Sequence, residues 1–164
     1  IGFMGSGKTF WGKRLSQRYE IPHIDLDEYI ATCEGKSISD LFAESGEPIF
    51  RQLEKKYLSE LIATKDHMLL STGGGTPCFF NNMDLMNASG PTIYLRCTPE
   101  LLYSRLRHEK SVRPLLTETS DEDLKRKISS LLQEREPYYQ KSRHILEMDQ
   151  TNDSTFEQII QRYV

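Results

Sequence analysis

The feature that most constrains this chain is an eight-residue stretch near its start, Gly2-Phe3-Met4-Gly5-Ser6-Gly7-Lys8-Thr9. It fits the pattern G-x-x-x-x-G-K-[ST], in which a glycine-rich loop surrounds the phosphates of a nucleoside triphosphate. The glycines let backbone N–H groups point at phosphate oxygens. Lys8 would contact the β- and γ-phosphates, and the Thr9 hydroxyl would bind Mg²⁺. The alternative is an ordinary glycine-rich turn between a strand and a helix.

The residues around the loop favour the nucleotide site, because a phosphate-binding loop joins a buried strand to a helix. Trp11, Leu15 and Tyr19 recur at helical spacing and predict a helix over residues 10–19 whose apolar face packs in the core. Only Ile1 precedes the loop, so we expect that the first strand is cut off in this sequence.

Length and composition exclude several classes of protein. A chain of 164 residues is one domain, residues 1–164, and its 21 basic and 24 acidic residues give a net charge of -3. This balance argues against a nucleic-acid or membrane-surface partner, and no apolar run could span a bilayer. The three cysteines form no metal or disulfide motif, which fits a cytoplasmic protein. We expect a monomer, because no sustained apolar stripe suggests a partner surface.

Helical and extended segments alternate along the chain, which predicts an α/β fold with a parallel sheet between layers of helices. Counting the truncated first strand, we expect five strands, the other four lying within residues 21–27, 67–72, 91–97 and 144–148. A polar stretch at about residues 107–120 lacks periodicity, and a loop of this length is often a lid.

An acidic pair, Asp25 and Asp27, ends the second of these predicted strands. Alternation along an extended chain would place both carboxylates on one side, at the sheet edge that faces the ligand in such folds. Two like charges that close favour a bound metal ion or hydroxyl donors. A solvated acidic strand end is the alternative.

Two further signals lie between residues 28 and 75. Residues 28–64 read as helical with a break at Ser45-Gly46-Glu47-Pro48, after which Arg51 and Glu54 sit at i, i+3 and can form an ion pair. The triplet Gly73-Gly74-Gly75 follows a strand directly, which allows a ligand or another loop to approach the backbone closely. A flexible turn would look the same.

Taken in order, the motifs of this chain resemble those of the shikimate kinase family, small P-loop kinases related in fold to the nucleoside monophosphate kinases. The ordered set runs nearly from end to end: Gly2 to Thr9, Asp25-x-Asp27, Phe50-Arg51-x-x-Glu54, Gly73-Gly74-Gly75, Arg113-Pro114-Leu115-Leu116 and Arg135-x-Pro137-x-Tyr139. The resemblance implies a three-layer P-loop fold with a mobile lid. It also implies transfer of the γ-phosphoryl group of ATP to the 3-hydroxyl of shikimate in aromatic amino acid biosynthesis, with Mg²⁺ as cofactor.

The resemblance also implies roles for single residues. Nucleotide binding would fall to Gly5, Ser6, Gly7, Lys8, Thr9, Phe10, Arg107, Arg113 and Asn152, and metal binding to Thr9 and Asp25. Shikimate would be held by Asp27, Arg51, Gly73, Gly74, Gly75 and Arg135. Catalysis would rest on Lys8, Asp27 and Arg113, with Asp27 orienting or deprotonating the attacking hydroxyl.

The chemistry of these residue types agrees with an anionic, hydroxylated acceptor. The planar fork of an arginine can bond both oxygens of a carboxylate, and an ionised aspartate accepts hydrogen bonds from hydroxyls. Phe42 and Phe50 could wall the acceptor ring or simply pack in the core. The chain also departs from the family pattern: Phe10 replaces a smaller residue, and the segment before Arg113 is about one residue short, so Arg107 and Asn152 are placed by position alone.

Two other functions stay open. One is a related P-loop kinase acting on gluconate or a nucleoside monophosphate, although a nucleotide acceptor would call for a base-binding pocket. The other is an ATP-binding module without catalytic activity, against which the joint presence of Lys8, Asp27 and Arg113 argues.

Overall fold

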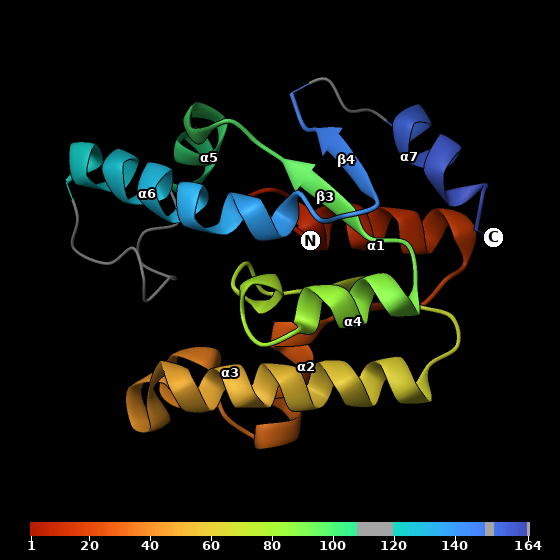
Figure 1. The fold of residues 1–164 in the computed structure, drawn as a ribbon, viewed down its shortest axis with the longest axis horizontal. Helices are drawn as coiled ribbons and strands as arrows, with labels where there is room; N and C mark the ends of the chain where they lie inside the picture. Colours follow the sequence, from red (N-terminus) through yellow and green to blue (C-terminus); the bar gives the residue numbers. More distant parts are fainter. Residues whose placement is uncertain (108–119, 150–152, 164) are drawn as a thin grey trace.

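The computed structural model of the protein describes residues 1–107, 120–149 and 153–163. Over these residues helices alternate with short parallel strands, as predicted (Figure 1). The strands are β1 (His23–Asp25), β2 (Leu69–Ser71), β3 (Ile93–Arg96) and β4 (His144–Glu147). They form two parallel pairs, β1 with β2 and β3 with β4.

Ile1 is hydrogen-bonded to β3 through its backbone. Its nitrogen donates to the carbonyl oxygen of Ile93 at 2.7 Å, and its own carbonyl oxygen accepts from the Leu95 nitrogen at 3.0 Å. The two bonds flank Tyr94, which is the pattern of parallel strand pairing. The Ile1 side chain packs against both apolar clusters of the protein. Among the described residues the sheet therefore consists of two pairs of strands with Ile1 added beside β3.

Helix α1 (Lys8–Tyr19) begins directly at the end of the glycine-rich loop. Gly7 caps it with a φ of 98°, a left-handed conformation that glycine adopts without steric cost. Leu15 is buried, and Trp11 and Tyr19 pack against the same apolar cluster, so the predicted apolar face of this helix is confirmed.

Helix α2 (Leu26–Glu34) begins earlier than the sequence pattern indicates. The Asp25 side chain accepts a hydrogen bond from the Asp27 nitrogen at 3.1 Å and caps the helix. The interpretation of residues 21–27 as one strand is therefore wrong: Asp25 ends β1, while Asp27 lies in the first turn of α2. An aspartate N-cap turns the chain as soon as the strand ends.

Helix α3 (Ile38–Thr64) carries the predicted break at Gly46, whose φ of 75° and ψ of 169° are not helical. Its second half presents Leu58 and Leu61, both fully buried, to the same cluster as Leu26 and Ile30 of α2. Figure 1 shows α2 and α3 together on one side of the molecule, apart from β3 and β4.

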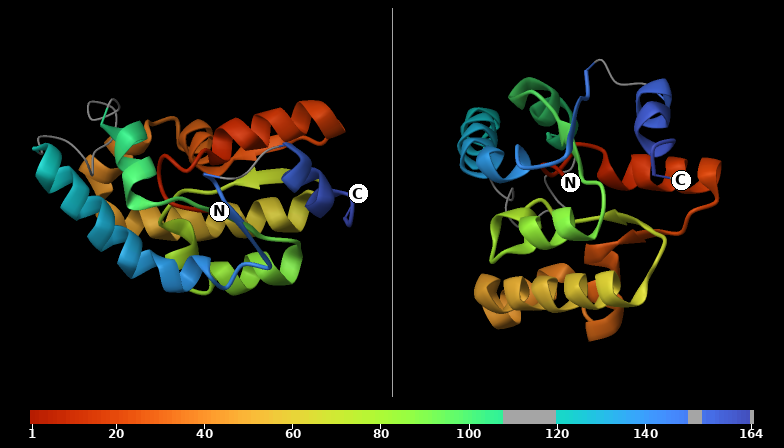
Figure 2. Two further views of the ribbon diagram at one scale, coloured as in Figure 1. Left: turned by 90° about the horizontal axis from the view of Figure 1, so that it is seen from above. Right: turned by 45° about the vertical axis from the view of Figure 1, so that its right-hand side comes forward.

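The remaining elements are η1 (Thr76–Cys78), α4 (Asn82–Ser89), α5 (Pro99–Leu106), α6 (Asp121–Tyr139) and α7 (Asp153–Ile160). Thr98 caps α5 through the Leu101 nitrogen. Helix α7 begins at Asp153, one residue before Ser154. Figure 2 shows α5 and α6 on the opposite side of the molecule from α2 and α3. No helix in the described parts of the chain is long and apolar enough to cross a membrane.

Candidate active site

A cleft of about 620 Å³ opens beside the glycine-rich loop. Its walls come from the loop, α1, the β1–α2 junction and the start of the glycine triplet, with Arg105 and Met148 from the other half of the molecule. The residues predicted for the site that line this cleft are Gly5, Gly7, Lys8, Thr9, Phe10, Asp25, Asp27, Gly73 and Gly74. The fold thus brings segments that are far apart in sequence to one cleft.

The Lys8 side chain is hydrogen-bonded to the backbone of its own loop. Lys8 Nζ donates to the carbonyl oxygens of Gly2 at 3.0 Å and Phe3 at 2.8 Å, so the side chain folds back across the loop. Gly5 has a φ of 79°, which favours glycine over residues with a side chain. Ser6 is buried within this loop.

Thr9 and Asp25 meet at the mouth of the loop. The Thr9 hydroxyl donates to Asp25 Oδ2 at 2.7 Å, across the gap between α1 and β1. A hydroxyl and a carboxylate are the oxygen ligands that Mg²⁺ accepts, and this ion usually takes one or two protein ligands beside waters and substrate phosphates. The described residues contain no group of three or more acidic, histidine or cysteine side chains placed to hold a metal. The pair fits a magnesium ion carried with a nucleotide.

Asp27 is the most perturbed carboxyl in the cleft. Burial first, and then the nearby carboxylates of Glu54 and Asp25, raise its pKa to about 6, against the opposing effect of Lys8 and Arg51. Its Oδ1 is buried and has no hydrogen-bond partner among the residues that the structure describes. A buried carboxylate oxygen that lacks a donor favours a ligand that brings a hydroxyl.

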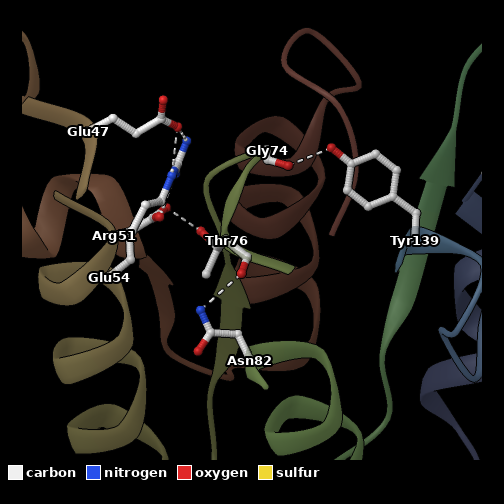
Figure 3. Close-up of polar contacts among 7 residues, drawn as sticks. All are labelled: Glu47, Arg51, Glu54, Gly74, Thr76, Asn82 and Tyr139. Atoms are coloured by element: carbon white, nitrogen blue, oxygen red, sulfur yellow. Dashed lines mark hydrogen bonds and ion pairs between the residues drawn. The ribbon is translucent and has the colours of Figure 1, made fainter. Parts of the chain in front are cut away.

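The Arg51 guanidinium is hydrogen-bonded to two carboxylates, those of Glu47 and Glu54 (Figure 3). Nη1 donates to Glu54 Oε2 at 2.5 Å, which confirms the predicted i, i+3 pair. Nε and Nη2 donate to Glu47 Oε1 at 3.0 and 2.7 Å. The other carboxylate oxygen of Glu54, Oε1, accepts a hydrogen bond from the Thr76 hydroxyl at 2.5 Å.

Three aromatic rings surround the same guanidinium. Its carbon lies 4.3 Å from the centre of the Phe79 ring, 5.5 Å from that of Phe50 and 6.0 Å from that of Phe42. Phe42 and Phe50 also contact each other, with their centres 4.5 Å apart, and Phe50 is buried. Phe50 therefore packs in the core, as one interpretation predicts, and it also covers Arg51; its contact with an acceptor ring stays a prediction.

The glycine triplet allows close approach, as predicted. A Cβ on Gly73 would lie 2.9 Å from Asp27 Oδ1 and 2.8 Å from Glu54 Oε1, and one on Gly75 would lie within 2.7 Å of the Arg51 guanidinium. A Cβ on Gly74 would lie 3.3 Å from Arg135 Nη1. A side chain on Gly73 or Gly75 would therefore collide with Asp27, Glu54 or Arg51, and one on Gly74 would crowd Arg135 and the backbone of Met4 in the glycine-rich loop.

The cleft lining does not include Arg51, Arg135 or Gly75. Gly75 is the last residue of the triplet, and the guanidinium groups of Arg51 and Arg135 lie beside Gly75 and Gly74. Arg135 lies on α6, is 9% exposed, and its guanidinium is stacked 5.6 Å from the Phe3 ring centre. One turn further along α6, the Tyr139 hydroxyl donates to the Gly74 carbonyl oxygen at 2.5 Å.

Sequence reasoning missed several residues of the cleft. Arg105 lines it and donates to the Gly5 carbonyl oxygen at 2.9 Å, whereas the predicted Arg107 does not line it and is exposed. Trp11, interpreted as core alone, packs in the core and also lines the cleft. No local pattern marks Arg105, because its partner Gly5 lies 100 positions away in the sequence. Arg113 and Asn152 lie outside the described residues.

Comparison with known proteins gives one consistent result. A family model described as shikimate kinase matches residues 4–164. The chain is 45% identical over 153 residues to a shikimate kinase of Phocaeicola vulgatus, covering 93% of this chain and 87% of that protein. It is 48% identical over 139 residues to a shikimate kinase of Azobacteroides pseudotrichonymphae, covering 85% and 82%.

Solved structures give the same result. The crystal structure of shikimate kinase from Bacteroides thetaiotaomicron matches with a TM-score of 0.87 and 39% identity, over 99% of this chain and 92% of that one. The shikimate kinase of Acinetobacter baumannii in complex with shikimate matches with a TM-score of 0.85 and 30% identity, again over 99% and 92%.

Proposed function

Because the chain belongs to the shikimate kinase family, we propose that its cleft binds ATP beside the loop Gly2 to Thr9 and shikimate between Asp27 and Arg51. The chain is an ATP-dependent kinase that phosphorylates a hydroxyl of shikimate. The observation that carries the proposed site is the convergence of Asp27, Glu54 and Arg51 on the backbone of Gly73 and Gly75.

The acceptor end of the cleft is built for an anion with hydroxyl groups. Arg51 and Arg135 approach the triplet from α3 and α6 and would bind the carboxylate of shikimate. Asp27, whose Oδ1 lacks a donor, would accept a hydrogen bond from a ring hydroxyl. Between the two arginines and Asp27, the shikimate ring would contact the backbone of Gly73, Gly74 and Gly75.

The nucleotide end is formed by the loop and the start of α1. The N-terminus of α1 and the amides of Gly5, Ser6 and Gly7 would bind the β- and γ-phosphates, since both present N–H groups to anions. Lys8 would leave the Gly2 and Phe3 carbonyls to contact the transferring phosphoryl group. Thr9 and Asp25 would hold the magnesium ion, which neutralises charge between the β- and γ-phosphates.

Asp27 would act on the attacking hydroxyl. With a pKa near 6 it is largely ionised at neutral pH, so it could orient the hydroxyl and take up its proton while the hydroxyl oxygen bonds to the γ-phosphorus and the bond from that phosphorus to the ADP oxygen breaks. Phosphoryl transfer asks the protein mainly for alignment and charge neutralisation, so orienting the hydroxyl would be the main task of Asp27.

Further residues and properties belong to the same proposal. Arg105, which lines the cleft, joins Phe10 as a candidate contact of the nucleotide; Arg107 and Asn152 stay predictions, as do Arg113 and the lid. The five-stranded sheet also stays a prediction, supported by the backbone hydrogen bonds between Ile1 and β3 and by the packing of Ile1 on both clusters. A monomer in the cytoplasm, with no nucleic-acid or membrane partner, also stays a prediction.

An ADP-release assay with shikimate, gluconate and AMP as acceptors separates the proposed function from the two alternatives. We expect turnover that depends on shikimate and on Mg²⁺. Turnover with gluconate or AMP instead would indicate a related kinase, and no turnover with any acceptor would leave an ATP-binding module.

The carboxylate role of Arg51 is tested by Arg51→Ala in the same assay. We expect the KM for shikimate to rise far more than the KM for ATP, because the guanidinium lies at the acceptor end. Equal increases in both constants would count against the assignment. Arg14→Ala is a suitable control, since Arg14 binds Asp153 on the outer surface.

A further inference from the structure

The guanidinium of Arg51 already carries two acidic partners, Glu47 on Nε and Nη2 and Glu54 on Nη1. A carboxylate that bonds a guanidinium with both oxygens uses either Nε and Nη2 or Nη1 and Nη2. Nη2 belongs to both pairs and donates to Glu47 Oε1 at 2.7 Å. Glu47 thus occupies the edge formed by Nε and Nη2, and Glu54 occupies Nη1 on the other edge. Binding of an acceptor carboxylate through both oxygens to Nε and Nη2 therefore requires Glu47 to move.

The other partner, Glu54, is not free to move. Its side chain is 1% exposed, and it is held by Arg51 Nη1 on one oxygen and by the Thr76 hydroxyl on the other. Thr76 is itself tied to α4, because Asn82 Nδ2 donates to its carbonyl oxygen at 2.9 Å (Figure 3). Displacing Glu54 would leave a charge buried without a partner, which is costly.

Glu47 differs from Glu54 in burial and in backbone. Its side chain is 49% exposed, so the displaced carboxylate would be hydrated at once. It follows Gly46, where the helix is broken by a φ of 75° and a ψ of 169°. Figure 3 shows Glu47 reaching Arg51 from the side opposite to Thr76.

We infer that Glu47 is an affinity-determining residue for the acceptor: its carboxylate binds Arg51 while the acceptor is absent and releases Nη2 when the acceptor's carboxylate arrives. The inference rests on the proposed role of Arg51. Each binding event then includes breaking an internal ion pair, so Glu47 weakens the affinity for shikimate. The opposite possibility, that Glu47 orients Arg51 for the acceptor, predicts a change of opposite sign.

The test is the dissociation constant of shikimate, measured by calorimetry for the wild type, Glu47→Gln and Glu47→Ala. We expect both variants to bind shikimate about two- to fivefold more tightly, as for loss of a partly exposed ion pair. The KM for ATP should not change. Unchanged or weaker binding of shikimate by both variants would overturn the inference.

A matched control separates release of Arg51 from a general change in charge. Glu44 is 54% exposed, lies three residues earlier on α3, and pairs with Lys36. Glu44→Gln removes the same charge without touching Arg51, and we expect it to leave the affinity for shikimate unchanged. Equal tightening by Glu44→Gln would overturn the inference in favour of long-range electrostatics.

A second control changes the ligand. The methyl ester of shikimate has no carboxylate to compete with Glu47, so Glu47→Gln and the wild type should bind it equally. Tightening of the ester by Glu47→Gln would contradict the exchange on Arg51. A wild type that neither binds shikimate nor releases ADP in its presence would overturn the proposed function itself. If the wild type does both, the proposed function stands, and the affinities of the Glu47 variants then test the role of Glu47 alone.

Discussion

The Tyr139 hydroxyl and the Gly74 carbonyl oxygen are 2.5 Å apart and join residues separated by 65 positions in the sequence. Tyr139 ends α6, and Arg135 lies one turn before it on the same helix. The bond therefore sets how α6 sits against the glycine triplet, and with it how Arg135 approaches the acceptor. In the proposed site this contact would position Arg135 for a substrate that Tyr139 need not touch.

We predict that Tyr139→Phe raises the KM for shikimate about two- to tenfold, the range expected for loss of one hydrogen bond. The KM for ATP should stay constant, because Tyr139 is not among the described residues that line the cleft beside the glycine-rich loop. Steady-state kinetics with each substrate varied in turn measures both constants. Tyr138→Phe is the control, since Tyr138 is 37% exposed. A rise in both constants in Tyr139→Phe would point to a general loss of structure instead.

Gly75 gives a prediction that separates crowding from backbone strain. Its φ of -86° suits any residue, yet a Cβ there would lie 2.5 Å from Arg51 Nη2. We predict that Gly75→Ala folds but moves the guanidinium, and that the KM for shikimate rises about ten- to a hundredfold. Gly90→Ala is the control, because nothing lies within 4 Å of its added methyl group. Normal shikimate kinetics in Gly75→Ala would refute the close approach.

Thr76 gives a prediction about an atom that contacts neither substrate in the proposed site. Thr76→Val removes the hydroxyl that donates a hydrogen bond to Glu54 Oε1. The buried carboxylate oxygen then loses this donor, which should lower the free energy of unfolding by about 1–3 kcal/mol. We expect a lower midpoint of thermal unfolding together with a raised KM for shikimate. Thr76→Ser keeps the hydroxyl and should restore both values.

Thr92→Val is the matched control for this pair of measurements. The Thr92 side chain is also largely buried, and its hydroxyl donates to Asn87 Oδ1 at 2.5 Å, away from the cleft. It should lower thermal stability without changing the KM for shikimate. If Thr76→Val behaves in the same way, Thr76 is structural and does not position Glu54.

The parts of this protein that could be predicted from sequence are those whose geometry is local. The loop Gly2 to Thr9, the i, i+3 pair of Arg51 and Glu54, and the break at Gly46 each depend on residues within one or two turns. The strand predicted through Asp27 fails for an equally local reason. Alternating polar and apolar residues at 24–27 indicate a strand, but the Asp25 cap starts a helix there.

The parts that could not be predicted depend on contacts between distant segments. Arg105 meets the Gly5 carbonyl across 100 positions, and Thr76 meets Glu54 across 22. Phe79 covers Arg51 only because the turn after the triplet folds back onto α3. A threonine or phenylalanine in such a turn carries no pattern that marks its partner, so these roles appear only once the fold is known.

Asp27 couples activity to stability with opposite signs. Its folded-state pKa of about 6 lies above the ordinary value of 3.8, so between these pH values the folded protein holds a proton that the unfolded chain has released. The contribution of Asp27 to the free energy of unfolding therefore falls as pH rises through this window. Shikimate-dependent kcat/KM should rise with pH near 6, because only the ionised carboxylate accepts the hydroxyl's proton.

Asp27→Asn separates the two effects. We predict that it abolishes the acidic limb and lowers kcat by about a hundredfold or more. It should also be more stable than the wild type at pH 7, by about 1–3 kcal/mol, with the difference shrinking as the pH falls below about 6 and disappearing near the ordinary pKa of 3.8. Glu28→Gln is the control, since Glu28 is the adjacent exposed carboxylate in α2. Chemical denaturation at pH 4, 5.5 and 7 measures the stability. If the variant loses activity and is also less stable than the wild type at pH 7, the ionised Asp27 carboxylate stabilises the fold. Burial that raises the Asp27 pKa predicts the opposite, because a buried carboxylate charge destabilises the folded state.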